Sequence, residues 1–435
     1  MLNENEECYW MLGGKLDEHL FCEEFVLKHN IVFMDGHFYC EKGIITDEGS
    51  IRRAVYEELV TCTRSNLARK VDSIMQTLRI SARRDIELDH ENKIHLANGT
   101  YDLYDGYREQ YHLCRHRLPA LFTNSNGHSE AWEKFLSELL EPEDILTLQE
   151  YMGYCLLPSN RAQKMLIILG NGGEGKSRIG VVMKAIFGQS MHVGSIAKLE
   201  NNNFAKADLE NVLVMVDDDL RLDALHSTNT IKSLISAEVP VDVERKYQQS
   251  YQANIHARFL AFGNGTLEAL HDRSYGFYRR QIILTAKPRD PKRVDDPYLG
   301  ETLAADRDHI LIWCLKGLYR LLAQNYQFTV SAKAKENWQQ NVTDQNNIVA
   351  FMESQGYFRI ENGKTITAKR LYELYRLWCE DNALKPLCQR TFSSYLIGNQ
   401  AAYGIHYCNN VPIADGKKAR GFMGITPQMQ GFGTR

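Results

Sequence analysis

The most specific chemical pattern in this sequence is a glycine-rich stretch that follows a short apolar run. The stretch reads GNGGEGKS from Gly170 to Ser177 and fits the pattern G-x-x-x-x-G-K-[ST]. The apolar run Met165–Leu169 precedes it, and a helical pattern, Arg178–Phe187, follows it. Glycines let backbone N–H groups turn inward around phosphate oxygens, and the start of a helix adds a favourable dipole. This order of elements predicts a site for a nucleoside triphosphate.

The stretch also predicts roles for individual residues in binding ATP and Mg²⁺. Lys176 would contact the β- and γ-phosphates, and the Ser177 hydroxyl would ligate Mg²⁺. The nucleotide-binding residues would be Gly170, Asn171, Gly172, Gly173, Glu174, Gly175, Lys176 and Ser177. The alternative is a glycine-rich turn that matches the pattern by chance, and the strand–loop–helix context argues against it.

A second apolar run, Val212–Val216, ends in three consecutive aspartates. Carboxylates at the end of a neighbouring strand are where an ATPase of this kind holds Mg²⁺ and orients water. We therefore expect Asp217 to be a metal ligand and Asp218 to activate water. The assignment is open by one residue, because Asp219 completes the triplet. The alternative is a solvated acidic turn after a core strand.

Two further strand ends carry polar residues. The apolar run Arg258–Phe262 leads to Asn264, which would orient the attacking water or sense the γ-phosphate, unless it merely forms a turn. Arg279 precedes another apolar run, Gln281–Leu284, and would project onto the γ-phosphate bound by a neighbouring subunit. Arg273 is a competing candidate, and a surface arginine pair is the alternative.

A basic hairpin is predicted between the acidic strand and the Asn264 strand. Val239–Val243 alternates as a strand does, Glu244–Tyr247 reads as a turn, and Gln248–Arg258 returns. Arg245 and Lys246 at its tip suit contacts with a nucleic-acid backbone. An ordinary surface hairpin is the alternative interpretation.

The last 90 residues predict two helices followed by a hairpin-like stretch, within a domain over 345–425. Thr367–Asn382 and Leu387–Ile397 have helical patterns, and the second helix would present Gln389 and Arg390 to DNA. A turn over 416–421 would be the wing, with its cations aimed at phosphate: Lys417, Lys418 and Arg420. Residues 331–435 carry a balance of +5 against −9 for the rest, which favours DNA binding over a protein-docking tail.

The composition of the chain indicates which broad class of protein it belongs to. The chain has 435 residues, 44% apolar and 24% charged, which is typical of a soluble globular protein of about three domains. No run is long and apolar enough to predict a membrane span, and no signal peptide is indicated. The ten cysteines lack metal-site spacing, so we expect reduced, buried thiols and a cytoplasmic location. The expected segments are 1–122 (mixed α/β), 123–163 (helical), 164–330 (ATPase) and 345–425.

These motifs, in this order, resemble those of the superfamily 3 helicases, which are AAA+-like ring ATPases. The similarity is to the helicase half of phage, plasmid and poxvirus primase-helicases, and it covers roughly 25–425. It extends to residues 92–170, to FAKADL at 204–209, to IKSLISAE from Ile231, and to the C-terminal stretches LYELYRLWCEDNALKPLCQRTFSSYL and KKARGFMGI. The resemblance implies an α/β fold with a P-loop AAA+-like core, a mixed N-terminal domain and a C-terminal winged helix.

The resemblance also implies a function. It places Arg245 and Lys246 on DNA in a central channel and makes Arg279 an arginine finger that acts in trans. Lys164 and Arg161 become candidates for a second trans contact. The chain would then be an ATP-dependent DNA helicase or translocase of a mobile element, a hexameric ring in replication initiation, working with a separate primase or polymerase.

The sequence departs from the family pattern in two respects. The aspartate triplet stands where the family often has a single acidic residue, and no primase part precedes residue 25, so we expect no primer synthesis. One alternative is a DNA-binding AAA+-type ATPase that remodels or loads another protein without unwinding. A small-molecule kinase is a further alternative, but it leaves Arg279, the basic hairpin and the basic C-terminal region unused.

Overall fold

The computed structural model describes residues 10–428 except 14, 89, 221–227, 238, 247–248, 265–276, 278, 338–346 and 414–416. The chain divides into two compact units. The first comprises 1–265 and 279–335, and the second comprises 266–278 and 336–435. Each unit has its own hydrophobic core.

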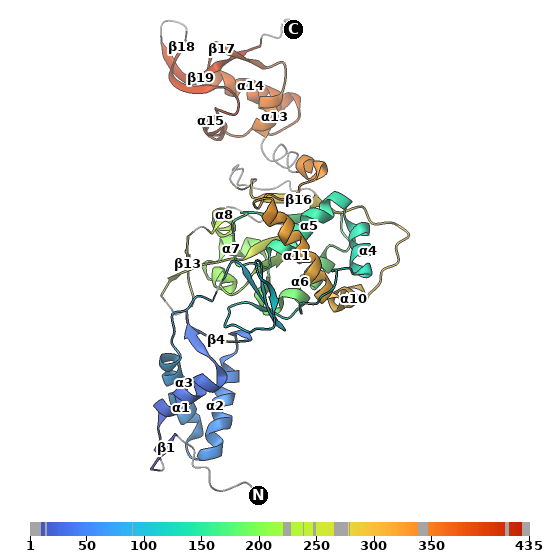
Figure 1. The fold of residues 1–435 in the computed structure, drawn as a ribbon. Coiled ribbons are helices and arrows are strands. Elements are labelled where there is room, and N and C mark those ends of the chain that lie inside the picture. Colours follow the sequence, from blue (N-terminus) through green and yellow to red (C-terminus); the bar gives the residue numbers. More distant parts are fainter. Residues whose placement is uncertain are drawn as a thin grey trace. The chain divides into compact units, whose positions relative to one another are not determined.

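A five-stranded parallel sheet forms the centre of the first unit (Figure 1). Its strands are β10 (Met165–Gly170), β11 (Met191–Val193), β12 (Val214–Asp217), β15 (Arg258–Asn264) and β16 (Gln281–Thr285). Their order in the sheet is β11-β12-β15-β10-β16, and every pairing is parallel. Strands buried on both faces read as continuous apolar runs, which is why the sequence predicted β10, β12, β15 and β16. It did not predict β11, in which Val193 is exposed. The α/β class is confirmed.

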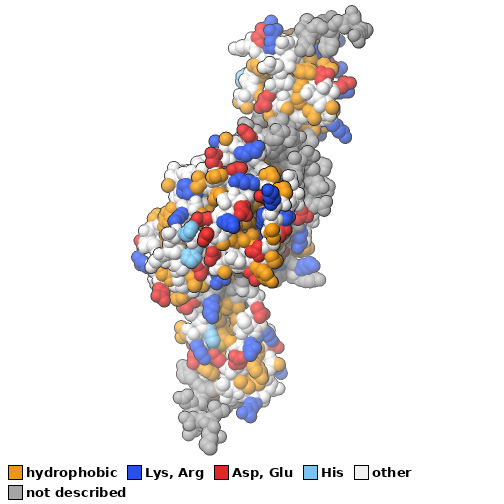
Figure 2. All heavy atoms as spheres, turned by 90° about the vertical axis from the view of Figure 1, so that its right-hand side faces the viewer, with side chains coloured by type: hydrophobic (Ala, Val, Ile, Leu, Met, Phe, Trp, Pro, Cys, Tyr) orange, Lys and Arg blue, Asp and Glu red, His pale blue; other side chains and the backbone are white. Residues whose placement is uncertain are grey.

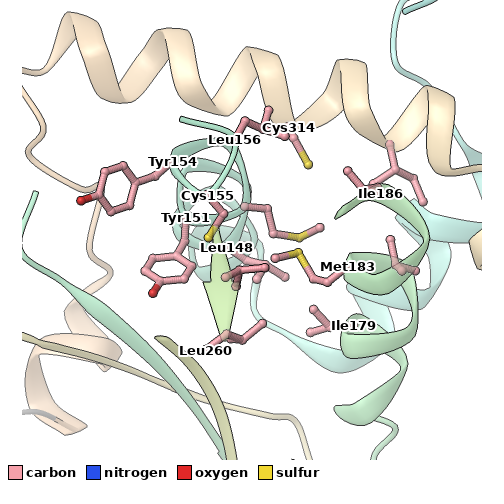
Figure 3. Close-up of a cluster of buried hydrophobic side chains, with 14 of the residues drawn as sticks. Leu148, Tyr151, Tyr154, Cys155, Leu156, Ile179, Met183, Ile186, Leu260 and Cys314 are labelled. Carbon is pink, nitrogen blue, oxygen red and sulfur yellow. The ribbon is translucent and has the colours of Figure 1, made fainter. Parts of the chain in front are cut away.

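Helices pack against this sheet and hold β10 in place. α5 (Pro142–Tyr154), α6 (Ser177–Phe187) and α11 (Arg307–Ala323) share one core with the sheet. Figure 3 shows Ile179, Met183 and Ile186 of α6 in this cluster, together with Tyr151 of α5 and Cys314 of α11. α5 and α11 pack so closely at Gly153 that a Cβ there would lie 2.4 Å from the carbonyl oxygen of Cys314. Only glycine fits at this contact. The same core includes α4 (Glu130–Leu139) and Leu303 of α10 (Leu299–Ala305).

The N-terminal part of the first unit has a smaller core of its own. It contains β1 (Met11–Leu12), β2 (Lys15–Leu16), α1 (Glu18–His29), β3 (Val32–Met34), β4 (His37–Cys40), β5 (Gly43–Ile45), α2 (Glu48–Cys62) and α3 (Leu67–Ser81). β3 and β4 form an antiparallel hairpin with its turn at Asp35-Gly36. α2 and α3 are separate helices, and Asn66 adopts a left-handed conformation between them.

A second small sheet lies within the segment 1–122. Its order is β8-β7-β6-β9, with β6 (Lys93–Leu96), β7 (Gly99–Asp102), β8 (Gly106–Arg108) and β9 (Arg117–Leu118). Ile94, Leu96 and Leu118 lie in the same core as the central sheet. Residues 93–120 therefore pack with the region that the sequence analysis assigned to the ATPase.

The first unit also contains short elements around the acidic strand. These are η1 (Gly188–Ser190), α7 (Ile196–Asn201), η2 (Asn203–Leu209) and α8 (Asn229–Ser236). The predicted basic hairpin is present as the antiparallel pair β13 (Val241–Val243) and β14 (Tyr251–Ala253).

The second unit packs helices against a three-stranded antiparallel sheet. Its elements are α13 (Asn347–Glu353), β17 (Phe358–Thr367), α14 (Ala368–Asp381), α15 (Gln389–Gly398), β18 (His406–Pro412) and β19 (Lys418–Pro427), with strand order β17-β19-β18. Both predicted helices are present, and Thr367 caps α14 by accepting a hydrogen bond from the Arg370 N–H. The predicted turn over 416–421 is wrong in part. Lys418 and Arg420 lie on β19, and 414–416 is outside the described residues.

The described residues include nine of the ten cysteines. Eight cysteines there are free thiols, and five of the eight are buried. Cys62 is disulfide-bonded, so the expectation of reduced thiols throughout is wrong at this position. No helix in the described part of the chain is long and apolar enough to cross a membrane.

A buried histidine makes the first unit sensitive to acid. His95 of β6 is 5% exposed, and its Nδ1 lies 3.2 Å from Thr100 Oγ1. Burial and then the charge of Arg117 lower the pKa of His95 to about 3. Between that value and the ordinary pKa of 6.5, the unfolded chain binds a proton that the folded chain does not. The neutral side chain therefore stabilises the fold above pH 6.5, and this stability is lost as the pH falls.

We expect the free energy of unfolding of the first unit to fall by about 2 kcal/mol between pH 7 and pH 5 through His95 alone. His95→Gln should remove that part of the pH dependence, because glutamine does not titrate. Urea unfolding of both proteins at the two pH values measures it. His309→Gln is the control, since His309 is exposed on α11. Equal pH dependence in all three proteins would contradict the assignment.

Candidate nucleotide-binding site

The glycine-rich stretch forms a loop between the carboxyl end of β10 and the start of α6. Gly172, Gly173 and Gly175 have φ angles of +102°, +83° and +102°, which residues with a Cβ rarely adopt. Glycine at these three positions is therefore required by the backbone. Ser177 is the first residue of α6, so this loop has the strand–loop–helix context that the sequence pattern predicts.

A cavity of about 680 Å³ opens beside this loop. Pockets for small ligands commonly have volumes of about 300 to 1,000 Å³, so this cavity is large enough to hold a nucleotide. Residues from four parts of the first unit line the cavity: Gly172–Arg178, Asp218, Phe262, Asn264, Arg289, Arg293, Asp295, Asp296, Pro297 and Leu299. The cavity thus gathers Lys176, Asp218 and Asn264, which the sequence analysis predicted to act together.

The parallel pairing of β10 with β15 explains how Asn264 reaches the loop. Gly170 and Asn264 are register partners at the carboxyl ends of the two strands. The Nζ of Lys176 donates hydrogen bonds to Asn264 Oδ1 at 3.2 Å and to Glu174 Oε2 at 2.8 Å. Lys176 is only 6% exposed, so the ammonium group is held at the loop by these partners.

The structure places the neighbouring aspartates in different surroundings. Asp217 is buried, and its two carboxylate oxygens accept hydrogen bonds from the N–H groups of Ile196 at 2.7 Å and Asp219 at 3.2 Å. Burial raises the pKa of Asp217, although both hydrogen bonds act in the opposite direction. These contacts argue against Asp217 as the Mg²⁺ ligand. Asp218 directly follows the last residue of β12, is exposed and lines the cavity.

Arg279 lies at the other end of the sheet from the loop. It precedes β16, whose first residue, Gln281, is the register partner of Met165 at the start of β10. The length of β10 therefore separates Arg279 from the loop by roughly 17 Å. Arg279 is exposed there, so a contact with nucleotide would have to be made in another subunit.

Lys164 and Arg161, the candidates for a second trans contact, both have partners within the unit. Lys164 donates a hydrogen bond to the backbone oxygen of Arg279, and burial together with the charges of Arg279 and Arg280 lowers the pKa of Lys164. Arg161 forms an ion pair with Glu91 at 2.6 Å. Arg273 lies outside the described residues.

Two arginines at the cavity were missed by the sequence analysis. Arg293 Nη1 donates to the backbone oxygen of Glu174 at 2.8 Å, and Arg289 forms an ion pair with Asp295 at 2.9 Å. Both follow β16, whose carboxyl end lies on the same edge of the sheet as the loop. The basic cluster of Arg289, Lys292 and Arg293 directly after an apolar run was the available signal.

The basic hairpin has a different arrangement from the expected one. Arg245 pairs with the buried carboxylate of Glu210, donates to His37 Nε2 at 2.9 Å and lies over the Tyr251 ring. Because this guanidinium is engaged inside the unit, the structure argues against Arg245 as a DNA contact. Lys246 is exposed at the turn and remains a candidate.

The C-terminal DNA-binding candidates are all exposed. Gln389 and Arg390 lie in the first turn of α15, Lys417 precedes β19, and Lys418 and Arg420 share one face of that strand. Figure 2 shows basic and acidic side chains interspersed on the face it presents. Contact of these residues with DNA stays a prediction.

Comparisons with known proteins support the fold. A family model described as "Family of unknown function (DUF5906)" matches residues 168–280, which include the loop, β12 and β15. No curated protein matches the sequence. A solved apo structure of the NrS-1 C-terminal region has 12% identity and a TM-score of 0.56, covering 94% of this chain and 100% of that one. The chain shares its fold with this region. A second structure of it, the A form, has a TM-score of 0.54 at 12% identity, with the same coverage.

Proposed function

We propose that this chain is an ATP-dependent DNA translocase of the superfamily 3 helicase type. One observation carries the proposal: a glycine-rich loop at the carboxyl end of a central parallel strand brings Lys176, Asp218 and Asn264 to one cavity. Ligands of open α/β sheets bind at the carboxyl ends of the strands. A lysine, a carboxylate and a polar strand-tip residue around a phosphate loop are the groups that ATP hydrolysis requires.

Each residue then has a role set by its position. The loop and Lys176 bind the triphosphate, and Asn264 holds Lys176 and faces the γ-phosphate. The exposed oxygens of Ser177 and Asp218 are hard donors at one cavity, which suits Mg²⁺. Asp218 also orients the attacking water. Arg289 and Arg293 add positive charge within the same subunit and balance the phosphates.

The DNA-dependent part of the proposal rests on charge and on the family resemblance. Lys246 is exposed at a hairpin turn, and residues 331–435 carry a balance of +5. Arg279 lies at the opposite sheet edge from its own loop, which suits a finger that completes the site of the next subunit in a hexameric ring. Action in replication initiation, a mobile-element origin and a separate primase or polymerase partner are proposed on the same resemblance.

ATP hydrolysis and strand displacement test this function with the full chain. We expect single-stranded DNA to stimulate phosphate release and ATP to drive displacement of a strand from a forked duplex. Stimulation by DNA without strand displacement would favour the remodelling or loading ATPase. Hydrolysis that DNA leaves unchanged would overturn the DNA-dependent function.

Asp218→Asn is expected to retain ATP binding and to lower the hydrolysis rate about a hundredfold, because the amide cannot act as a base toward water. Asp219→Asn is the matched control. Asp219 is exposed, as Asp218 is, but it does not line the cavity. Phosphate release and equilibrium binding of a fluorescent ATP analogue give the two readouts. Full activity in Asp218→Asn together with loss in Asp219→Asn would move the catalytic role by one residue.

A further inference from the structure

The loop contains an acidic residue at a place where it would repel phosphate. Glu174 lies in the middle of Gly170–Ser177 and is only 3% exposed. Its carboxylate accepts hydrogen bonds from the N–H of Asn171 at 2.5 Å, the N–H of Gly172 at 3.1 Å and Lys176 Nζ at 2.8 Å. A carboxylate thus occupies the part of the loop that is built to bind an anion.

The donors around Glu174 are those that the proposed function assigns to phosphate. Two consecutive backbone N–H groups and the loop lysine converge on one carboxylate, as they would on a phosphate oxygen. Burial raises the pKa of Glu174, but the hydrogen bonds from Lys176 and the backbone outweigh burial and leave it below its ordinary value. The group in the loop is therefore an anion.

The carboxylate and a phosphate cannot share these donors. A Cβ placed on Gly170 would lie 2.7 Å from Lys176 Nζ and 2.8 Å from Glu174 Cδ, so the space between the loop and the ammonium group is filled. Each N–H group has one proton to donate, and both are directed at Glu174. A phosphate oxygen can take over these two N–H donors only after the carboxylate has left.

The loop also provides a way for Glu174 to leave. Gly173 and Gly175, on either side of it, have φ angles of +83° and +102°, so the backbone next to Glu174 has the freedom of glycine. The open cavity adjoins this point, and Arg293, already bonded to the backbone oxygen of Glu174, is a cationic partner for the displaced carboxylate.

We propose that Glu174 is an internal competitor of the nucleotide phosphate, which occupies the loop without nucleotide and sets the affinity for nucleoside triphosphates. This inference rests on the proposed nucleotide site and adds a specificity-determining residue to it. Removing the negative charge should strengthen binding of any ligand with a polyphosphate. It should not affect ligands that lack phosphate.

The test compares the full chain with Glu174→Gln and Glu174→Ala. We expect both variants to bind ATP and inorganic tripolyphosphate at least about tenfold more tightly, because hydrogen bonds to a charged acceptor are roughly twice as strong as neutral ones. Adenosine binding should not change. Glu138→Gln is the matched control, since it removes one negative charge from an exposed position on α4. Calorimetric titration measures the affinities, and thermal unfolding checks that each variant is folded.

The outcomes separate this inference from the proposed function. If wild-type protein binds ATP and neither variant binds it more tightly, the competitor role is overturned and the nucleotide site stands. An equal gain for adenosine or in Glu138→Gln would also overturn it, since the effect would not concern the phosphate position. If no protein in the series binds ATP or tripolyphosphate, both proposals fail together.

Discussion

Lys176→Ala is expected to lower the rate of ATP hydrolysis by about a hundredfold to a thousandfold, the usual cost of removing one group that stabilises developing charge. Lys176 is the cation that the loop holds at the phosphate position, with Asn264 Oδ1 at 3.2 Å. Steady-state phosphate release with saturating ATP and DNA measures the effect. A rate within a few-fold of the wild-type rate would contradict the nucleotide site.

Lys176→Ala also changes the surroundings of Glu174, and a control must separate this effect from the loss of the nucleotide contact. Removal of the ammonium group leaves the Glu174 carboxylate buried without its charged partner, which destabilises the loop. The double variant Lys176→Ala/Glu174→Gln removes that problem, so activity that is still absent in it is due to the lost contact with nucleotide. Lys134→Ala, at an exposed position on α4, is the matched single change and should keep full activity.

Arg258→Met is expected to lower the free energy of unfolding of the first unit by about 3 to 5 kcal/mol. Arg258 begins β15 and is 2% exposed. Its guanidinium donates to the backbone oxygens of Cys155 at 2.8 Å and Ser159 at 3.1 Å, and to those of Leu157 and His256. Methionine fills a similar volume but leaves these buried carbonyl groups without a donor. Arg258 thus joins the end of α5 to the central sheet.

Urea unfolding followed by circular dichroism measures this loss. Arg108→Met is the control, because Arg108 pairs with Asp105 on the surface, where an ion pair contributes about 0 to 1 kcal/mol. A loss below about 1 kcal/mol in Arg258→Met would mean that water replaces the guanidinium at the carbonyl groups. We expect the variant to lose ATP hydrolysis at lower temperature than wild type, since β15 also carries Asn264.

The sequence alone determined the elements and much of the candidate site. Apolar runs at 165–169 and 258–262 predicted buried parallel strands, because such strands lack a polar face. The positive φ angles of Gly172, Gly173 and Gly175 explain why the loop pattern is so specific. In the second unit, α14 begins after Thr367 as predicted, because capping and helical periodicity are local properties.

Side-chain direction and long-range partners were decided only by the tertiary structure. Asp217 and Asp218 are adjacent in sequence, yet packing against α7 occupies the first and leaves the second at the cavity. Glu210 lies 35 residues from Arg245 and still withdraws it from the surface. The sequence placed Glu174 among the nucleotide-binding residues, and only the folded loop shows that its N–H groups are directed at the Glu174 carboxylate. Such pairings depend on register and burial, which a local pattern does not contain.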